Sequence, residues 1–365
     1  MRDRRREPLP IWCDPRRYVA HPHLACLADG AWLLVATSAP RRAGTLHPPL
    51  DPAFVTIALR STDEGRSWSA PAPVPAAGYA GAECAGLTAL PGGGVLCNQW
   101  RYRWYSERDT PEEPVADAAA LRAELAASAE LDDAEDPGIA WSRGGGATTV
   151  WRSADQGQSW SDPVTPDVAP YSGGYGLRGG LAFPDGEVVL PLCDPPHYAR
   201  VFLVRSRDGG RSWSPPEPVA VGDGLAFEEP ATLALADGTL LMLLRENAGR
   251  SLHAVRSADR GITWTTPAAA GLDGYPAHLV HLDDGRVAAV TGVRRPRGAI
   301  RLALSADGGR NWDRATDVAG DLDTHDCGYP TAAATRDGGL YVAYYCRDRD
   351  GVTGLHGRWL DRTDL

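Results

Sequence analysis

The apolar residues of this chain fall into short runs of strand length that are separated by tight turns. In residues 229–264, the runs ATLAL and TLLMLLR flank an Ala-Asp-Gly turn, and SLHAVRS leads into a second turn, SADRGITW. The pattern predicts a four-stranded antiparallel sheet of about 35 residues. A sheet this small cannot bury both of its faces alone, so the chain should contain further copies of it.

The second turn follows the pattern Ser-x-Asp-x-Gly-x-x-Trp. Its Asp can accept backbone N–H groups of its own turn, its Gly can adopt the left-handed conformation, and its Trp can wedge between sheets. We therefore interpret these Asp residues as turn formers and not as catalysts. The pattern occurs five times, at residues 61–68, 153–160, 206–213, 257–264 and 305–312.

The first turn is repeated six times, and the chain ends soon after the sixth copy. Six first turns and five second turns predict an all-β, six-bladed β-propeller in which one end of the chain completes the last blade. We expect residues 1–365 to form a single domain, because six blades of roughly 50 residues use most of the chain. The six turns lie at residues 28–30, 91–93, 184–186, 236–238, 283–285 and 336–338.

Composition narrows the possible functions. The net charge of −10 argues against a nucleic-acid partner. Every basic residue other than His is Arg, which excludes a Schiff-base lysine and a phosphate-binding loop lysine. No apolar run is long enough to span a membrane, so we expect no membrane partner. No sequence feature implies a cofactor.

The basic start, MRDRRREPLP, is not followed by the apolar segment of a secretory signal. The seven Cys residues are scattered and contain no CxxC pair, which is typical of reduced thiols. We therefore predict a cytoplasmic protein, either a monomer or a homo-oligomer. The run HDC at residues 325–327 resembles part of a metal site, but no second cluster at ligand spacing supports it, and we predict no metal.

The second blade carries a long insertion, from about residue 104 to residue 146. It contains PVADAAALRAELAASAELDDAED, whose Ala, Glu and Leu residues have strong helix propensity. We expect an acidic helical insertion on one rim of the propeller. It could be a solvated decoration, or a lid or contact between subunits.

The repeat also locates a candidate site. Residues about nine positions before each turn Gly should converge on one mouth of the central channel, together with the ends of the second strands, while the Asp-containing turns lie at the opposite face. One such residue could be a solvent-exposed strand end, but a ring of ionisable groups around one pocket favours a site. The inner positions are His21, Glu83, Arg178, Glu229, Tyr275 with His278, and Tyr329, and the second strands add Arg101, Asp194, Arg245 and Arg294.

The five Asp turns and the run EPATLALADGTLLMLLR resemble the sialidase (neuraminidase) superfamily, in its bacterial branch with BNR repeats, where such turns are called Asp boxes. The resemblance covers nearly the whole chain and is specific for the fold rather than for the activity. It implies that Tyr329 is the nucleophile, that Glu229 is its base, and that Asp51 in the blade-1 loop is the general acid. It also implies a carboxylate site that contains Arg245 and one of Arg294, Arg297 and Arg301.

This chemistry suits the residue types. A phenol is a poor nucleophile until a base takes its proton, and a neutral Tyr is not repelled by a substrate carboxylate. Arginine side chains bind carboxylates as forks. The resemblance thus implies an exo-glycosidase that hydrolyses a terminal acidic sugar, such as sialic acid.

The chain departs from the family pattern at one place. The first arginine of the family's carboxylate site stands just before the Pro of blade 1, where this chain has Ala20 and His21. Arg16 and Arg17 lie a few residues upstream and could replace it. Without that arginine another acidic sugar is also plausible, and two further functions remain open. These are a uronate lyase that uses Tyr or His to remove a proton, and a non-catalytic glycan-binding propeller.

Overall fold

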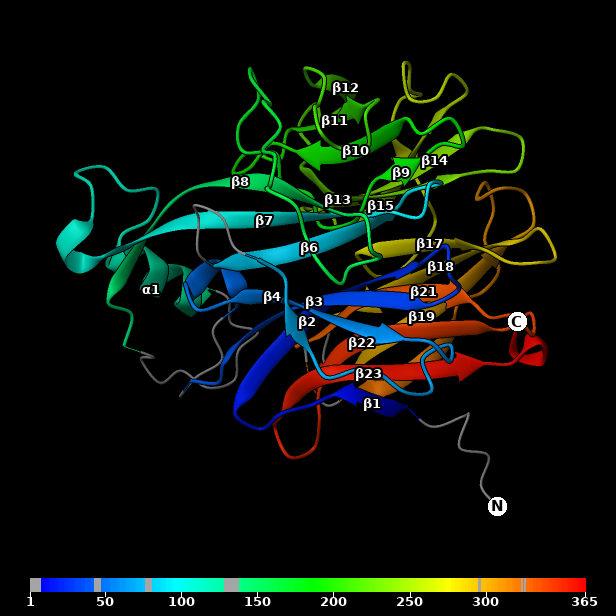
Figure 1. Cartoon of the computed structure of the whole chain (residues 1–365), viewed down its shortest axis with the longest axis horizontal. Coiled ribbons are helices and arrows are strands. Elements are labelled where there is room, and N and C mark those ends of the chain that lie inside the picture. Colours follow the sequence, from blue (N-terminus) through cyan, green and yellow to red (C-terminus); the bar gives the residue numbers. More distant parts are fainter. Residues whose placement is uncertain are drawn as a thin grey trace.

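Six β-sheets surround a central axis, and the helical insertion projects from one side of the ring (Figure 1). The computed structural model describes residues 8–42, 47–75, 81–127, 138–294, 297–322, 324 and 326–365. The first strands of successive blades contact one another, and the strand of blade 6 contacts that of blade 1, so the ring is closed. The predicted six-bladed propeller is confirmed.

Each blade is an antiparallel sheet of consecutive strands. Blade 1 contains β2 (Arg17–Cys26), β3 (Trp32–Pro40), β4 (Val55–Ser61) and β5 (Ala72–Pro73), and blade 2 contains β6 (Ala82–Ala89), β7 (Val95–Ser106) and β8 (Trp141–Ser153). Blade 3 contains β9 (Leu181–Ala182), β10 (Val188–Cys193), β11 (Arg200–Ser206) and β12 (Glu217–Val221). Blade 4 contains β13 (Phe227–Ala234), β14 (Leu240–Glu246), β15 (Ser251–Ser257) and β16 (Ala268–Ala269). Blade 5 contains β17 (Ala277–His281), β18 (Val287–Val293), β19 (Gly298–Ser305) and β20 (Thr316–Leu322).

Blade 6 joins the two ends of the described chain. Its sheet contains β21 (Cys327–Ala334), β22 (Leu340–Arg347), β23 (Thr353–Leu360) and, as its outer strand, β1 (Leu9–Trp12). β1 pairs antiparallel with β23, with Leu9 opposite Gly357. An end of the chain therefore completes the last blade, as the repeat count predicts.

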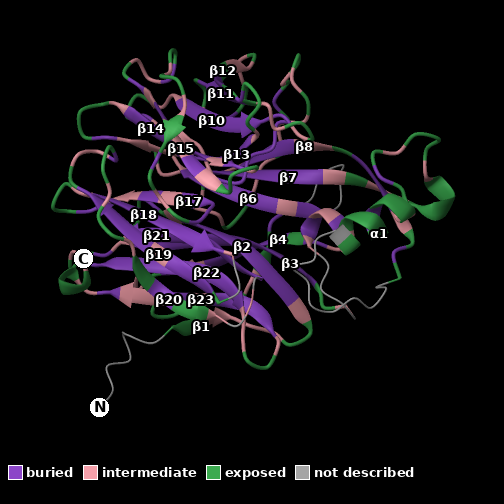
Figure 2. Ribbon diagram, turned by 180° about the vertical axis from the view of Figure 1, so that it is seen from behind, coloured by how far each residue is buried: buried purple, intermediate pink, exposed green. Residues whose placement is uncertain are grey.

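The central strands of the blades are buried on both faces, because each sheet packs against its two neighbours (Figure 2). This explains why β14 and β18 are continuous apolar runs rather than alternating ones. The exposed positions lie mainly in the turns and in the insertion.

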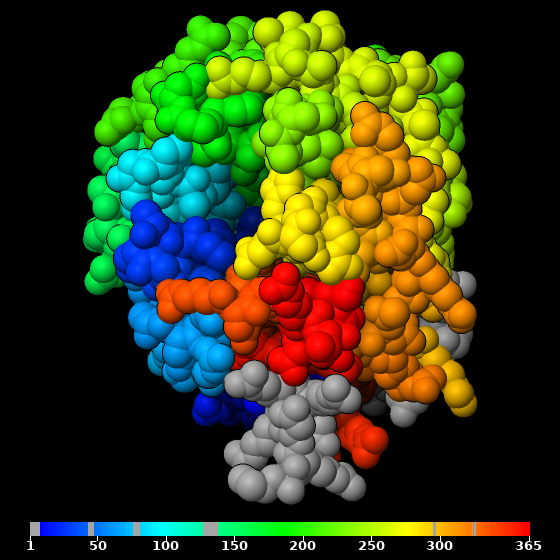
Figure 3. Space-filling view, turned by 90° about the vertical axis from the view of Figure 1, so that its right-hand side faces the viewer, coloured from blue at the N-terminus to red at the C-terminus, as the bar shows by residue number. Residues whose placement is uncertain are grey.

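The Asp-containing turns have the expected architecture. In the first of them, Asp63 Oδ1 accepts hydrogen bonds from the Ser67 N–H and the Ser61 hydroxyl, both at 2.8 Å, and Gly65 has φ +80°. In the other four turns the backbone N–H of the residue four positions later likewise donates to the Asp Oδ1, at 2.8–2.9 Å. The acceptors are Asp155, Asp208, Asp259 and Asp307. Figure 3 views the face of the ring that carries the turns, and the colours pass around it in chain order.

Blade 2 has three strands instead of four, and blade 3 has a short first strand. The outer edge of blade 2 has only an isolated bridge between Val150 and Val164, and the prolines at 163 and 166 deprive that segment of N–H donors for a ladder. The first strand of blade 3 was expected near residue 178 but begins at Leu181. The segment before it presses against blade 2, where a side chain on Gly179 would overlap the backbone of Leu87.

Both ends of the insertion, which were expected to be loop, are paired strands. β7 and β8 continue as a long hairpin in which Trp104 is paired with Arg143. The described part of the tip, residues 107–127 and 138–140, returns to the sheet at Ala116, which forms an isolated bridge to the same Arg143. The tip holds a 3-10 helix, Glu107–Asp109, and the predicted helix, α1 (Ala118–Ala127); residues 128–136 of the predicted helical stretch lie outside the described residues. In the described part of the chain, no helix is long and apolar enough to cross a membrane.

A small separate core joins this insertion to the blade-1 loop. Leu50 packs with Ala116, Leu121 and Ile139. The loop also contains a 3-10 helix, Pro48–Leu50, and its carbonyl oxygens accept hydrogen bonds from Trp141 and Arg143 of the hairpin, at 2.9 and 2.6 Å. The insertion therefore braces the loop that borders the predicted site. A third 3-10 helix, Arg362–Asp364, follows blade 6.

Candidate active site

Three inner strands carry the same β-bulge, and each bulge presents one polar side chain at the predicted mouth of the channel. The bulged pairs are His21-Pro22, Glu229-Pro230 and Tyr329-Pro330, each of which lies opposite a single residue of the next strand. The first residue of each pair has a left-handed backbone, with φ of 53°, 51° and 47°. This conformation is costly for a non-glycine residue, and strain of this kind is concentrated at functional sites.

Tyr329 and Glu229 are in direct contact across the mouth. The Tyr329 hydroxyl donates a hydrogen bond of 2.7 Å to Glu229 Oε1. The other carboxylate oxygen, Oε2, accepts a bond of 2.8 Å from Arg245 Nη1. Tyr175 also directs its hydroxyl at Glu229 Oε1, at 3.5 Å. Both Tyr329 and Glu229 are buried, so this pair is fixed by contacts from three different blades.

The two adjacent carboxyl groups of blade 4 have opposite pKa shifts. Burial raises the pKa of Glu228 to about 7, although Arg245 lies 3.2 Å from it. Burial would also raise the pKa of Glu229, but the Arg245 guanidinium and the Tyr329 hydroxyl outweigh it and hold that pKa below its usual value. Burial and the charge of Glu229 raise the pKa of Tyr329 well above its ordinary value. Glu229 is thus an ionised carboxylate and Tyr329 a neutral phenol.

His21 lies against Tyr329, with ring centroids 4.2 Å apart. Its Nδ1 lies 2.9 Å from the carbonyl oxygen of Glu83, and because a carbonyl only accepts, Nδ1 carries the proton. Burial lowers the pKa of His21 to about 4, so the ring is neutral at pH 7. His21 therefore contributes no positive charge beside Tyr329.

Glu83, Arg294 and Tyr275 also reach this cluster. The Glu83 carboxyl accepts a hydrogen bond of 2.7 Å from the Tyr102 hydroxyl, and burial raises its pKa to about 7. Arg294, at the end of β18, lies over the Tyr329 ring at 5.8 Å. Arg245 lies over the Tyr275 ring at 4.4 Å. The structure thus brings seven predicted residues together: His21, Glu83, Glu229, Arg245, Tyr275, Arg294 and Tyr329.

Arg178 and His278 bond to backbone groups of the inner strands. Arg178 is buried and donates to the carbonyl oxygens of Pro22 and Pro330, at 3.3 and 2.8 Å. It thereby ties together the bulges that carry His21 and Tyr329. His278 Nδ1 accepts the N–H of Ala332 at 3.2 Å and serves as a bridge between inner strands. Burial lowers the pKa of Arg178 to about 10 and that of His278 to about 3.

Two other predicted residues have partners outside the cluster. Arg301 lies on the third strand of blade 5 and forms ion pairs with Asp273 and Asp317. Asp51 is 1% exposed, and Arg42 holds its two carboxylate oxygens through Nε and Nη2, at 2.5 and 3.0 Å. Arg297, the other competitor for the carboxylate site, is exposed.

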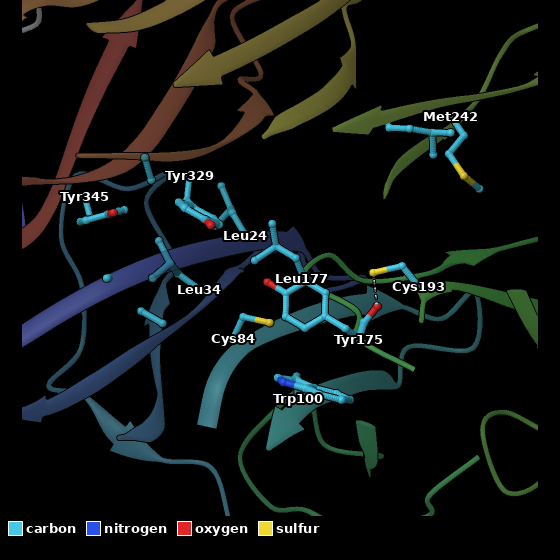
Figure 4. Close-up of a cluster of buried hydrophobic side chains, with 14 of the residues drawn as sticks. Leu24, Leu34, Cys84, Trp100, Tyr175, Leu177, Cys193, Met242, Tyr329 and Tyr345 are labelled. Atoms are coloured by element: carbon cyan, nitrogen blue, oxygen red, sulfur yellow. Dashed lines mark hydrogen bonds between the residues drawn. The ribbon is translucent and has the colours of Figure 1, made fainter. Parts of the chain in front are cut away.

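Sequence reasoning missed several residues that line the cluster. His47 of the blade-1 loop has its ring 5.2 Å from that of His21, and Tyr345 of β22 lies 6.0 Å from Tyr329. Figure 4 shows Tyr345 beside Tyr329, with Tyr175 near Cys84 and Trp100. Only Tyr345 could have been found from the repeat, because it lies seven positions after the turn Gly338 at the end of a second strand. His47 and Tyr175 come from irregular segments whose place in the fold the repeat does not define.

The candidate site is separate from a cavity on the turn face of the ring. That cavity, of about 810 Å³, lies between blades 2 and 3 and is lined by turn residues such as Gly92, Gly186 and Asp208. It contains none of the predicted site residues. Within the described residues, no group of three or more His, Cys, Asp or Glu side chains is placed to hold a metal ion. His325 of the HDC run lies outside the described residues.

Comparison with known proteins gives one family match and one short match to a curated protein. Residues 134–342 match the family described as BNR repeat-like domain. A protein of Bacteroides fragilis (strain YCH46) named sialidase is 28% identical over 121 residues. That alignment covers 31% of this chain and only 22% of the relative.

Solved structures extend the likeness to nearly the whole chain. A Dyadobacter fermentans DSM 18053 protein described as of unknown function has a TM-score of 0.81 and 23% identity, over 97% of this chain and 98% of that one. The NanB sialidase of Streptococcus pneumoniae has a TM-score of 0.70 and 14% identity, over 98% of this chain and 71% of that one. At these identities the likeness shows the shared propeller fold and not a shared substrate.

Proposed function

Because this chain belongs to the BNR repeat-like family within the sialidase superfamily, we propose that it is a retaining exo-glycosidase that hydrolyses a terminal acidic sugar. The observation that carries the proposal is the 2.7 Å hydrogen bond from the Tyr329 hydroxyl to Glu229. A buried phenol is activated as a nucleophile by a base within hydrogen-bond distance, and Glu229 is ionised and in contact.

The reaction would proceed in two steps. Glu229 takes the phenolic proton while Tyr329 Oη bonds to the anomeric carbon and the leaving group departs with a proton from an acid. In the second step water attacks the anomeric carbon and gives one proton to the conjugate base of that acid, Tyr329 leaves and recovers its own proton from Glu229, and the sugar is released with its configuration retained. Glu229 must therefore gain and lose one proton in each cycle, which agrees with a carboxylate held between Tyr329 and Arg245.

Charge at the mouth favours an anionic sugar. Arg245 and Arg294 carry two positive charges, whereas Glu229 is the one carboxyl group of Glu83, Glu228 and Glu229 whose pKa is held low. At slightly acidic pH the other two are largely protonated, so the two guanidinium groups face one ionised carboxylate. A substrate carboxylate would share the guanidinium forks with Glu229.

We propose a carboxylated sugar as the substrate class and not sialic acid in particular, because neither Ala20 nor the neutral His21 supplies the charge of the family's first arginine. The neutral His21 ring is also the observation that favours the uronate-lyase alternative. A neutral imidazole 4.2 Å from the Tyr329 ring, measured between ring centroids, could accept a proton from a uronate C5.

A substrate panel tests the proposal. Wild-type protein is assayed on an aryl sialoside, an aryl uronide and a uronate polymer, with free aglycone and ultraviolet absorbance both recorded. Aglycone release that Tyr329→Phe abolishes and Tyr171→Phe retains would support the glycosidase; Tyr171 stacks on Phe202, away from the cluster. Absorbance near ~235 nm from an unsaturated uronate without aglycone release would favour the lyase. Binding of an acidic sugar without either product would favour the binding module.

A further inference from the structure

The blade-1 carboxylate, Asp51, is arranged as an ion-pair partner. Besides the fork from Arg42, Asp51 Oδ1 accepts the N–H of Ala53 at 2.9 Å. Arg42 itself lies over the Trp141 ring at 5.0 Å, so the pair helps to attach the blade-1 loop to the insertion. Three donors therefore engage the Asp51 carboxyl, which is arranged as a hydrogen-bond acceptor within an ion pair.

Glu83, on blade 2, carries a carboxyl group near enough to Glu229 for the charge of Glu229 to raise its pKa. It stands at the start of β6, and its carbonyl oxygen is bonded to His21, whose ring lies against Tyr329. Glu83 is half-buried, so part of it is accessible to solvent. Tyr102 donates to Oε2, and Oε1 has no hydrogen-bond donor among the described residues. One oxygen is therefore anchored and the other is available at the mouth.

The surroundings of Glu83 favour its protonated form. Burial is the main cause of its raised pKa, and the charges of Glu228 and Glu229 add to it. The Tyr102 hydroxyl and Arg143 act in the opposite direction. Tyr198 of blade 3 also faces this carboxyl, and it is neutral. A group with a pKa of about 7 can give up a proton and regain it within one catalytic cycle at neutral pH.

We propose that Glu83, rather than Asp51, gives a proton to the leaving-group oxygen. The inference rests on the proposed function. As the bond from the anomeric carbon to the leaving-group oxygen breaks, the proton on Glu83 passes to that oxygen and Glu83 becomes a carboxylate. In the second step Glu83 takes a proton from the attacking water, which restores the acid. Tyr102 holds the carboxyl in place throughout and is a positioning residue.

Leaving-group dependence tests the assignment. Glu83→Gln keeps an acceptor for Tyr102 but has no proton to give. Wild type, Glu83→Gln and Asp51→Asn are compared on a 4-nitrophenyl glycoside and an alkyl glycoside of the acidic sugar that wild type hydrolyses. We expect Glu83→Gln to lose roughly 10²–10³-fold in kcat/KM on the alkyl glycoside and less than about tenfold on the aryl one, because a good leaving group needs little protonation. Asp51→Asn should change both rates in parallel.

A second variant keeps Glu83 in place. Tyr102→Phe removes a hydrogen bond that lowers the pKa of Glu83, so the basic limb of the kcat/KM profile should move to higher pH. The protonated carboxyl can also be followed without turnover, as an infrared C=O band near neutral pH that Glu83→Gln removes.

Each contrary outcome has a distinct meaning. Selective loss on the alkyl glycoside in Asp51→Asn, with a flat response in Glu83→Gln, would overturn the assignment and leave the glycosidase intact. Absence of the infrared band, or an unmoved basic limb in Tyr102→Phe, would also overturn it. A wild-type protein that hydrolyses neither glycoside would overturn the proposed function and, with it, this role of Glu83.

Discussion

Tyr329 and Glu229 are 100 residues apart in the chain, and their side chains are joined by a hydrogen bond of 2.7 Å between blades 6 and 4. Each residue stands on a bulge with a left-handed backbone and is followed by proline. The contact therefore depends on two strained segments being held at a fixed separation by the closed ring.

The pair should act as one unit. Tyr329→Phe removes the nucleophile and Glu229→Gln removes its base, so each should lower kcat by about 10³-fold or more. The double variant should be about as slow as either single variant, because the two groups perform one step. Steady-state kinetics of the three variants, with unfolding curves as the folding control, measure this. Losses that multiply would show that the two residues act separately.

Arg245 should discriminate between carboxylated and neutral sugars. Arg245→Lys keeps the charge but loses the fork that contacts Glu228 and Glu229. We expect binding of an acidic monosaccharide to weaken by about 1–3 kcal/mol in free energy. Titration calorimetry would measure the corresponding rise in the dissociation constant. Arg301→Lys makes the same chemical change away from the cluster and serves as the matched control. Equal affinities in wild type and Arg245→Lys would remove Arg245 from the binding site.

The buried Glu83 should make stability depend on pH. Its folded-state pKa, about 7, exceeds the ordinary value of 4.5, so its contribution is fully present below about pH 4.5 and is lost as the pH rises through 7. Glu83→Gln should therefore gain stability relative to wild type between pH 5 and pH 8. The gain should not exceed roughly 3 kcal/mol, and should be smaller because the side chain is half-buried. Urea unfolding at several pH values provides the comparison, and a pH-independent difference would contradict the assigned shift.

Arg178 should hold the two bulges in place. Arg178→Met keeps the length of the side chain but removes the donors to the Pro22 and Pro330 carbonyl oxygens. We expect a loss of about 2–4 kcal/mol in the free energy of unfolding, since two buried acceptors lose their partners. Exposed Arg207→Met should change stability by less than about 0.5 kcal/mol. If the two variants are equally stable, Arg178 does not brace the channel.

The repeat predicted the blades and their inner positions because turn chemistry is local. Gly30, Gly238 and Gly338 each stand nine residues after a site residue, and counting from them located His21, Glu229 and Tyr329. The same count placed Arg178 one residue out of register, which agrees with the irregular start of blade 3, and in the structure Arg178 bonds to backbone groups of the inner strands.

Features that depend on contacts between blades could not be read in this way. His47 and Asp51 share one loop, and the sequence favoured Asp51 because of its chemical type. In the structure, Arg42 engages Asp51, while His47 lies against His21. Arg301 was a candidate only because it precedes a turn, and its partners on blade 5 became visible once the sheet was known.

The pairing of β1 with β23 has a consequence for the order of folding. Leu9 is synthesised long before its partner Gly357. β1 therefore has no partner strand until β23 has been synthesised. Tyr329 belongs to β21 of the same blade, so a chain that ends before β21 cannot form the contact with Glu229 on blade 4. A nascent or truncated chain could hold five finished blades and still present no reactive phenol.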